Sequence, residues 1–223
     1  MARDMLITLE QKIDPRWAAL LVIDMQNDFC AQGGAFHRSG VDVTPLQAPA
    51  KPIGQLVDSA RQSGVPVIFV RNVYNTPGGW YLSDVTLEQA LRCWNGRYHT
   101  IPMCEAGSWG GDFYIGIRPS ESDLVITKHR FNAFVNTDLD LVLRSKGIRT
   151  VLACGVLTNI CVESTVREAF FRDYYTIVPS DGVATIDDEL QRVSLRNIAF
   201  GFGRVVGSVQ LRQVWESRKL MAS

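Results

Sequence analysis

The stretch Ala18-Ala19-Leu20-Leu21-Val22-Ile23-Asp24 decides the fold. Six apolar residues in a row, followed by an acidic residue and a glycine-containing loop, predict a strand that is buried on both faces. Comparable apolar runs recur along the chain at 65–70, 124–127, 151–154 and 176–178, with a weaker sixth at 204–206. A sheet built from such strands must be covered on both sides.

Segments with helical spacing lie between most of these runs. They are 52–61, a segment that opens at 136–138 and stops at Gly147, 159–172, and 187–200. Strands that alternate with helices imply right-handed crossovers and a mainly parallel sheet. We therefore predict an α/β fold, a three-layer α/β/α arrangement in a single domain over residues 1–223.

Composition narrows the kind of partner. The 223 residues are 46% hydrophobic and 21% charged, which is ordinary for a globular protein with a sizeable core. Lys plus Arg equals Asp plus Glu at 23 each, so no net charge draws the chain to nucleic acid or to an anionic membrane. No apolar run approaches the roughly 20 residues of a membrane span, and the N-terminus lacks the apolar stretch of a signal peptide. We expect a small-molecule partner.

The cysteines favour a reducing compartment. They are odd in number and scattered, with no CxxC pair, at Cys30, Cys93, Cys104, Cys154 and Cys161. This pattern argues against a disulfide framework and against a structural zinc site. We expect a cytoplasmic protein in which one thiol can be reactive.

One long stretch, 72–122, fits neither pattern and is rich in Gly, Pro, Trp and Tyr. Structureless loops beyond about 12–15 residues are uncommon in compact domains. We expect this excursion to contain short helices and to shape a pocket, with a poorly ordered insertion as the alternative. Its aromatic residues could line a pocket or an interface: Trp80, Tyr81, Trp94 and Trp109.

Three reactive side chains stand at or just beyond predicted strand ends. Asp24 follows the first strand, Lys128 follows the third, and Cys161 lies in the turn that leads from the fourth strand into a helix. Ligands of doubly wound sheets bind outside the carboxyl ends of the strands. The sequence thus predicts a carboxylate, an amine and a thiol at the same edge of one sheet.

Together these groups permit nucleophilic chemistry on an amide. Only a thiolate is strongly nucleophilic, and both Lys128 and the helix N-terminus would favour the anion of Cys161. Asp24 could take the thiol proton and later return it to a leaving amine. Backbone N–H groups of Leu157 and Cys161 would hold the oxyanion. Singly, each residue has a plainer explanation: a buried structural thiol, a turn cap, or a solvated strand-end charge.

Longer motifs add a resemblance. Leu20 to Phe29 (LLVIDMQNDF), Lys128 after a strand, and Gly155 to Thr165 (GVLTNICVEST) resemble, in order, the isochorismatase-like cysteine hydrolases over almost the whole chain. The resemblance implies a six-stranded parallel sheet of Rossmann-like form and a catalytic triad of Asp24, Lys128 and Cys161. It also implies a cis peptide bond between Val156 and Leu157, and a homo-oligomer, either a dimer or a tetramer.

Departures from the wider superfamily narrow the choice of subfamily. Nicotinamidases have an Asp-x-His metal motif after the second strand, where this chain reads Arg71-Asn72-Val73-Tyr74, and the chain's histidines are His37, His99 and His129. We therefore expect neither a metal nor another cofactor. Isochorismatases proper lack the cysteine nucleophile, so Cys161 argues against their reaction.

Further pieces resemble the ureidoacrylate amidohydrolases, among them residues 134–140, 143–149 and 161–165. Biuret, triuret and N-carbamoyl amino acid hydrolases share the Asp-Met-Gln opening and the style of the 29–34 loop. The resemblance indicates a linear ureide or carbamoyl amide as substrate, contacted by Gln26, Phe29, Asn72 and Tyr74. Three alternatives stay open: an amidase for another small amide such as maleamate or nicotinamide, a binding protein that kept the fold, and a redox protein, disfavoured because no second cysteine neighbours Cys161 in sequence.

Overall fold

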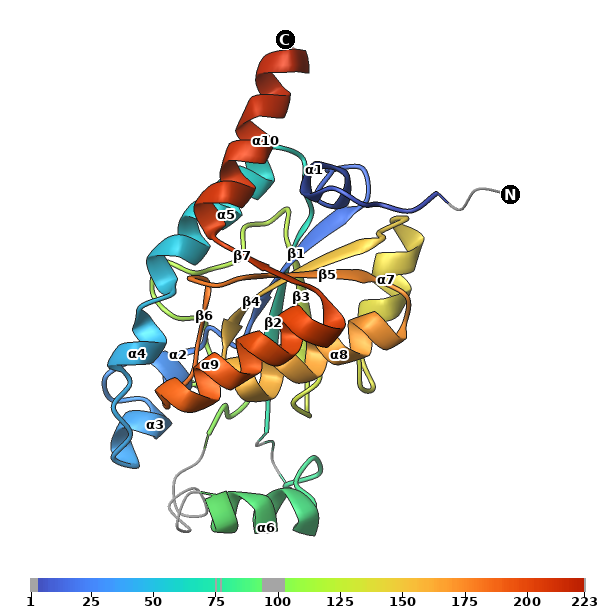
Figure 1. The fold of residues 1–223 in the computed structure, drawn as a ribbon. Coiled ribbons are helices and arrows are strands. Elements are labelled where there is room, and N and C mark those ends of the chain that lie inside the picture. The colour runs from blue at the N-terminus through green and yellow to red at the C-terminus, as the bar shows by residue number, and fades with distance from the viewer. Residues whose placement is uncertain (1–3, 75, 77, 94–102, 223) are drawn as a thin grey trace.

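A parallel sheet forms the middle of the computed structural model, which describes residues 4–74, 76, 78–93 and 103–222 (Figure 1). The strand order is β3-β2-β1-β4-β5-β7, and β6 pairs with β4 off this path. Every strand pairing is parallel. The strands are β1 (Ala18–Ile23), β2 (Val67–Asn72), β3 (Leu124–Lys128), β4 (Thr150–Val156), β5 (Tyr175–Pro179), β6 (Val183–Ala184) and β7 (Arg204–Val206).

The six predicted strands are all present, and β6 makes a seventh. β5 pairs with β4 only along Thr150–Leu152, and β6 then pairs with the carboxyl end of β4, at Gly155 and Val156. Two residues are too few to produce an apolar run in the sequence, so the pattern predicted six strands.

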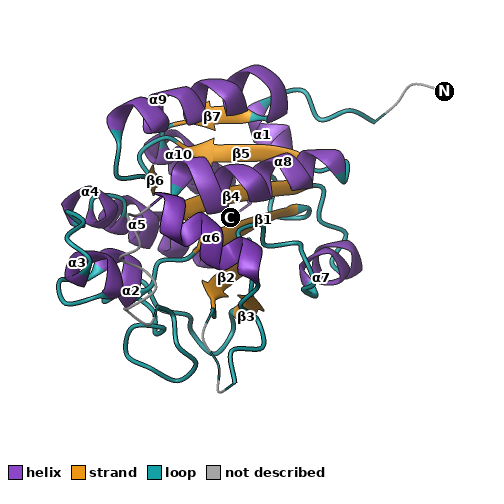
Figure 2. Cartoon of the chain, turned by 90° about the horizontal axis from the view of Figure 1, so that it is seen from below, coloured by secondary structure: helices purple, strands orange, loops and turns teal. Residues whose placement is uncertain are grey.

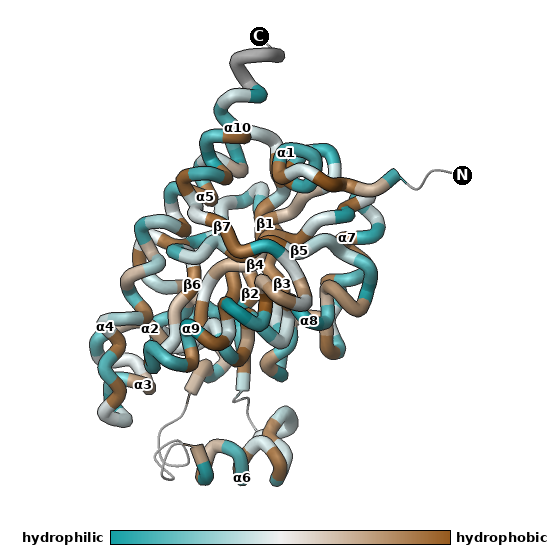
Figure 3. Tube along the Cα trace, viewed as in Figure 1, coloured by the Kyte–Doolittle hydropathy of each residue, from teal (hydrophilic) through white to brown (hydrophobic). Residues whose placement is uncertain are grey.

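Helices cover both faces of the sheet, as expected for three layers. Alternate residues of β1 enter two separate cores, Leu20 and Val22 in one and Ala19, Leu21 and Ile23 in the other. In Figure 2, α5 and α7 lie on opposite sides of the strands, and the apolar strands stand out at the centre of Figure 3. The α-helices are α1 (Leu9–Lys12), α2 (Asn27–Cys30), α3 (Ala35–Arg38), α4 (Thr44–Gln47), α5 (Ala50–Gln62), α6 (Asp84–Cys93), α7 (Leu139–Ser145), α8 (Glu163–Phe171), α9 (Asp188–Asn197) and α10 (Ser208–Ala222).

Two of the predicted helices start or end in a wider turn. The helix predicted at 159–172 begins with a π-helical turn, η2 (Thr158–Val162), and continues as α8. The helix predicted at 187–200 is α9 followed by a second π-helical turn, η3 (Ile198–Phe202). π-Helical turns are rare and are frequent at functional sites, and η2 contains Cys161.

The excursion at 72–122 contains a helix, as expected. This helix, α6, lies apart from the sheet in Figure 1 and has no buried residue. Trp80 and Trp109 are exposed. Trp94 and His99, which the sequence singled out, lie outside the described residues.

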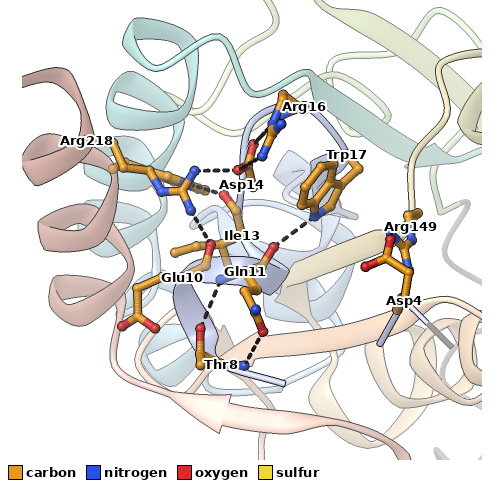
Figure 4. A network of polar contacts seen from close by, with 11 residues as sticks. Asp4, Thr8, Glu10, Gln11, Ile13, Asp14, Arg16, Trp17, Arg149 and Arg218 are labelled. Carbon is orange, nitrogen blue, oxygen red and sulfur yellow. Dashed lines mark hydrogen bonds and ion pairs between the residues drawn. The ribbon is translucent and has the colours of Figure 1, made fainter. Parts of the chain in front are cut away.

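The C-terminal helix α10 is fastened to the segment before β1 (Figure 4). The fully buried Trp215 donates its indole N–H to the Ile13 carbonyl at 2.8 Å, and Arg218 pairs with Asp14. Hydrogen bonds from Arg16, joined by those from Arg218, hold the pKa of Asp14 well below its usual range. Within the described part of the chain, no helix combines the length and apolar character needed to span a membrane.

We predict that Trp215→Ala lowers the free energy of unfolding by about 3–5 kcal/mol, because it leaves a cavity in the core and an unpaired carbonyl at Ile13. Urea denaturation measures the change. Trp80→Ala is the matched control, since Trp80 is 85% exposed and surface substitutions cost within about 0.5 kcal/mol. Equal effects of the two substitutions would contradict this account of α10.

Candidate active site

The structure brings Asp24, Lys128 and Cys161 together at the carboxyl edge of the sheet. The Lys128 Nζ lies 2.7 Å from Asp24 Oδ2 and 3.6 Å from Cys161 Sγ. The three residues are 1%, 0% and 6% exposed, respectively. A carboxylate, an ammonium and a thiol are thus in mutual reach and screened from water, as their positions at or just beyond the ends of β1, β3 and β4 predicted.

A sharp turn places the Asp24 carboxylate at this edge. Asp24 has a φ of +53°, a conformation that Asp adopts more readily than most residues. Its N–H still donates to the Val70 carbonyl at 2.9 Å, as a last rung of the β1–β2 ladder, but its own carbonyl accepts from the Gln26 N–H at 2.7 Å. The main chain therefore leaves the sheet at Asp24.

Cys161 sits in the first turn of the helix formed by η2 and α8. Two N–H groups, of Ile160 and Val162, donate to the Leu157 carbonyl at 3.2 Å each, and that of Cys161 between them does not. The peptide bond between Val156 and Leu157 is cis, as the resemblance implied. Leu157 and Cys161 thus lie close along the chain at the start of this helix, where N–H groups are commonly left free for an anion.

Burial dominates the electrostatics of the three groups. It raises the pKa of Asp24 although Lys128 opposes the shift. Burial also opposes the charge on Lys128, but attraction by Asp24 and Cys161 outweighs it and raises the pKa of the ammonium. Lys128 favours the anion of Cys161, as the sequence predicted, but other contributions outweigh it. Burial, helped by the Asp24 charge, raises the pKa of the thiol above its usual value. The direction of this shift favours a thiol over a free thiolate at Cys161.

Asn72 and Tyr74, two of the predicted substrate contacts, lie next to these groups. Asn72 is the register partner of Lys128. It is fully buried, and neither its amide nitrogen nor its amide oxygen makes a hydrogen bond of normal geometry among the described residues, although the Tyr74 hydroxyl lies close enough for this amide to act on its pKa. Burial raises the pKa of the Tyr74 hydroxyl, and the nearby Cys161 and Asp24 raise it further.

Gln26 and Phe29, the other two predicted contacts, are engaged within the protein. The Gln26 amide donates to the carbonyls of Asn72 at 3.0 Å and Gly111 at 2.8 Å, and accepts from the Asn72 N–H at 2.7 Å. Phe29 packs edge-on against Phe36, with ring centroids 5.1 Å apart. A role for either side chain as a direct substrate contact stays a prediction.

Sequence reasoning missed how the excursion returns to the site. Asp28 accepts from the backbone N–H of Cys104 at 2.7 Å and of Ala35 at 2.8 Å, and its own N–H donates to the Gly110 carbonyl. A side chain at Gly110 would collide with the Asp28 carboxylate. The Gly110-Gly111 pair was a usable signal, because glycine often marks a close backbone approach.

The other end of the excursion contacts the neighbours of Lys128. The Tyr81 ring stacks on the His129 ring with centroids 3.5 Å apart, and Arg130 donates to the Tyr81 carbonyl at 3.0 Å. The Arg130 carbonyl in turn accepts from the Lys128 ammonium at 3.1 Å. Both ends of the excursion therefore adjoin candidate catalytic residues.

The place of the nicotinamidase metal motif holds no metal-like cluster. Arg71 there donates to the Thr127 hydroxyl at 3.1 Å. Among the residues that the structure describes, no three His, Cys, Asp or Glu side chains form a group able to hold a metal ion. That the protein needs no metal stays a prediction.

Comparison with known proteins agrees with the geometry. The model of the isochorismatase domain matches residues 18–210. The chain belongs to the isochorismatase family. Its similar relatives include two proteins named ureidoacrylate amidohydrolase RutB, from Methylobacterium radiotolerans and Serratia proteamaculans. They are 35% and 34% identical to this chain over 203 and 197 residues, each match covering 86% of it and 77% and 79% of the relative.

Solved structures of the family are similar as well. A cysteine hydrolase from Pseudomonas syringae pv. phaseolicola superposes with a TM-score of 0.81 at 28% identity, covering 97% of this chain and 99% of that one. An N-carbamoylsarcosine amidase from Thermoplasma acidophilum gives a TM-score of 0.66 at 28% identity, with coverages of 86% and 96%. These matches establish the fold and the hydrolase class of the chain.

We predict that Asp24→Asn makes Cys161 react with iodoacetamide at a lower pH than in the unmodified protein. A nearby negative charge disfavours a thiolate, so its removal lowers the thiol pKa and increases the thiolate fraction at a given pH. Mass spectrometry of the peptide that contains Cys161 gives the rate against pH, with the exposed Cys93 as internal reference. A labelling profile that is unchanged or shifted to higher pH would contradict the assignment.

Proposed function

We propose that the chain is a cysteine amidohydrolase that cleaves a C–N bond of a small linear ureide or carbamoyl amide, of the ureidoacrylate, biuret or triuret kind, and releases ammonia or carbamate. The observation that supports it best is the contact of Lys128 with both Asp24 and Cys161 in a buried site. The similarity to proteins named ureidoacrylate amidohydrolase supports the substrate class.

The proposed mechanism follows from the charges. Asp24, with its raised pKa, is a stronger base than an ordinary carboxylate and takes the proton of the Cys161 thiol as Sγ attacks the carbamoyl carbon. Lys128 stabilises the developing negative charges, and the N–H groups of Leu157 and Cys161 hold the oxyanion. Asp24 then protonates the departing nitrogen, which leaves a thiocarbamate on Cys161. Water completes the reaction.

The polar groups around the triad suit a ureide. Asn72 offers a donor group and an acceptor that make no hydrogen bond of normal geometry inside the described protein, and the neighbouring Tyr74 adds a hydroxyl that its raised pKa keeps protonated. A ureide alternates N–H and C=O groups that match them. A buried amide that lacks a good hydrogen-bond partner costs free energy. A polar substrate bound at this place would supply the missing hydrogen bonds.

Another carbamoyl amide is the second candidate. The similarity to an N-carbamoylsarcosine amidase favours it over an amide without a carbamoyl group. A small-molecule partner, a homo-oligomeric state and a cytoplasmic location remain predictions of the sequence.

We predict that Cys161→Ala and Cys161→Ser lower kcat by about 10³-fold or more without loss of folding, because residues that act as a catalytic unit fail together when one is removed. Ammonia release, measured across ureidoacrylate, biuret, triuret, N-carbamoyl amino acids, maleamate and nicotinamide, gives the rates. Cys93→Ser, at an exposed thiol, is the control and should keep full activity. Retention of more than a tenth of the activity by either Cys161 variant would refute the nucleophile.

We predict that kcat/KM for the best linear ureide exceeds that for nicotinamide by about 10⁴-fold. A site built to hydrogen-bond a polar substrate leaves its own groups unpaired when the substrate lacks the matching ones. The same screen measures the ratio at one pH and one enzyme concentration. A tenfold preference for nicotinamide or for a simple aliphatic amide would overturn the substrate class and leave the cysteine mechanism standing.

A further inference from the structure

We propose that Gln26 is a positioning residue: its side chain replaces a missing strand beside Asn72 and thereby directs the Asn72 amide to the substrate. This assigns Gln26 a role different from the substrate contact that the sequence suggested. The inference rests on the proposed function, because it concerns how the same site recognises the polar group of its substrate.

The need for Gln26 arises where β1 ends. Asp24 donates to the Val70 carbonyl, and in a parallel ladder the next bond would run from the Asn72 N–H to the Asp24 carbonyl. The turn at Asp24 prevents this, because that carbonyl accepts from Gln26 instead. The last residue of β2 therefore loses its neighbour on the β1 side while β3 still pairs with it at Lys128.

The Gln26 side chain supplies the missing bonds. Its carbonyl oxygen accepts from the Asn72 N–H at 2.7 Å, and its amide nitrogen donates to the Asn72 carbonyl at 3.0 Å. The second N–H of the same nitrogen donates to the Gly111 carbonyl at 2.8 Å. One side-chain amide thus pairs both main-chain groups of Asn72 and links them to the returning excursion.

No other side chain of similar shape can do this. Glutamate has no N–H to give to two carbonyls and would repel both when ionised. Methionine has the length and no strong hydrogen-bonding group. The pair of carbonyls at Asn72 and Gly111 therefore selects an amide at position 26.

The consequence lies in the Asn72 side chain. Register partners on neighbouring strands point to the same face of a sheet, so Asn72 projects beside Lys128, on the face where Lys128 meets Asp24 and Cys161. Its main chain is held by Gln26, whereas its buried amide nitrogen and oxygen make no hydrogen bond of normal geometry among the described residues, with the Tyr74 hydroxyl as a close neighbour. A fixed main chain and a side-chain amide without a strong protein hydrogen bond form the arrangement expected of a residue that hydrogen-bonds a substrate.

The test is a double-mutant cycle on the best substrate of the ammonia-release screen. Gln26→Met and Asn72→Ala should each lower kcat/KM by about 10- to 100-fold, the size of a lost buried hydrogen bond. If Gln26 acts through Asn72, the double variant is within about threefold of Asn72→Ala. Alkylation of Cys161 by iodoacetamide should stay within about threefold of the unmodified protein in all three. Multiplied losses in the double variant would overturn the inference.

Gln47→Met is the matched control. Gln47 is a half-buried glutamine whose amide donates to the Cys30 carbonyl at 2.8 Å. Among the described residues it makes no hydrogen bond to the three candidate catalytic residues or to Asn72, and its loss should leave kcat/KM unchanged. An equal loss of kcat/KM in this control would mean that any buried glutamine bond matters, and would overturn the assignment to Gln26.

A second readout separates this inference from the proposed function. Hydrogen exchange of the Asn72 backbone N–H should quicken at least tenfold in Gln26→Met, or in Gln26→Leu should the first variant not fold, because neither side chain keeps the oxygen that accepts from this N–H. An unchanged exchange rate of the Asn72 N–H would overturn the proposed role of Gln26 even if the protein hydrolyses ureides. Absence of ureide turnover in the unmodified protein would refute the function, while the exchange data would still decide whether Gln26 holds Asn72.

Discussion

The buried ion pair between Asp24 and Lys128 is the constraint around which the carboxyl edge of the sheet is arranged. Taking two charges out of water costs several kcal/mol each, and their attraction offsets this only with close geometry and further hydrogen bonds. Lys128 has such a bond to the Arg130 carbonyl. Apart from the ion pair, neither Asp24 oxygen makes a hydrogen bond of normal geometry among the described residues, and the Cys161 thiol lies close enough to act on the Asp24 pKa. The carboxylate therefore retains accepting capacity beside Cys161, as the proposed role of Asp24 as a base requires.

The strand order of the parallel sheet determines how Asp24 can reach Lys128. β1 and β3 are separated by β2, so an aspartate in line with β1 would lie two strands away from Lys128. The turn at Asp24 closes that gap by taking the main chain out of the ladder. As a result, the main chain of Asn72 loses its hydrogen-bonding neighbour in β1. The Gln26 side chain takes the place of that neighbour. One departure from regular structure thus accounts for several of the polar contacts at the site.

Much of this could be read from the sequence, because strands buried on both faces leave long apolar runs and reactive residues stand where those runs end. The strand of residues 18–23 and the convergence of Asp24, Lys128 and Cys161 followed from that pattern. The two-residue strand β6 left no pattern. Helix α10 left a weak one, since Leu211 and Trp215 are buried among several charged residues. The thiol pKa was misjudged because the extent of burial is a property of the packed protein.

The hydrogen-bond partners of Gln26 and Asp28 could not be identified from the sequence for a different reason, although the Gly110-Gly111 pair signalled a close approach of the main chain. Each side chain makes hydrogen bonds to residues tens of positions away, at Gly111 and at Cys104. Sequence spacing carries no information about such pairings. Only the motif around them could be recognised, and a motif does not distinguish a residue that touches a substrate from one that holds its neighbour in place.

The anchoring of the excursion has a consequence for how such a protein can diversify. One end is held by the stacking of Tyr81 on His129, and the other by the bonds of Gly110 and Gly111 to Asp28 and Gln26. Between these anchors, helix α6 buries none of its residues. Substitutions on α6 therefore meet few packing constraints, while those at the anchors meet many. Substitutions can therefore accumulate on α6 without altering the residues at the carboxyl edge of the sheet. The excursion is a segment in which related enzymes can diverge.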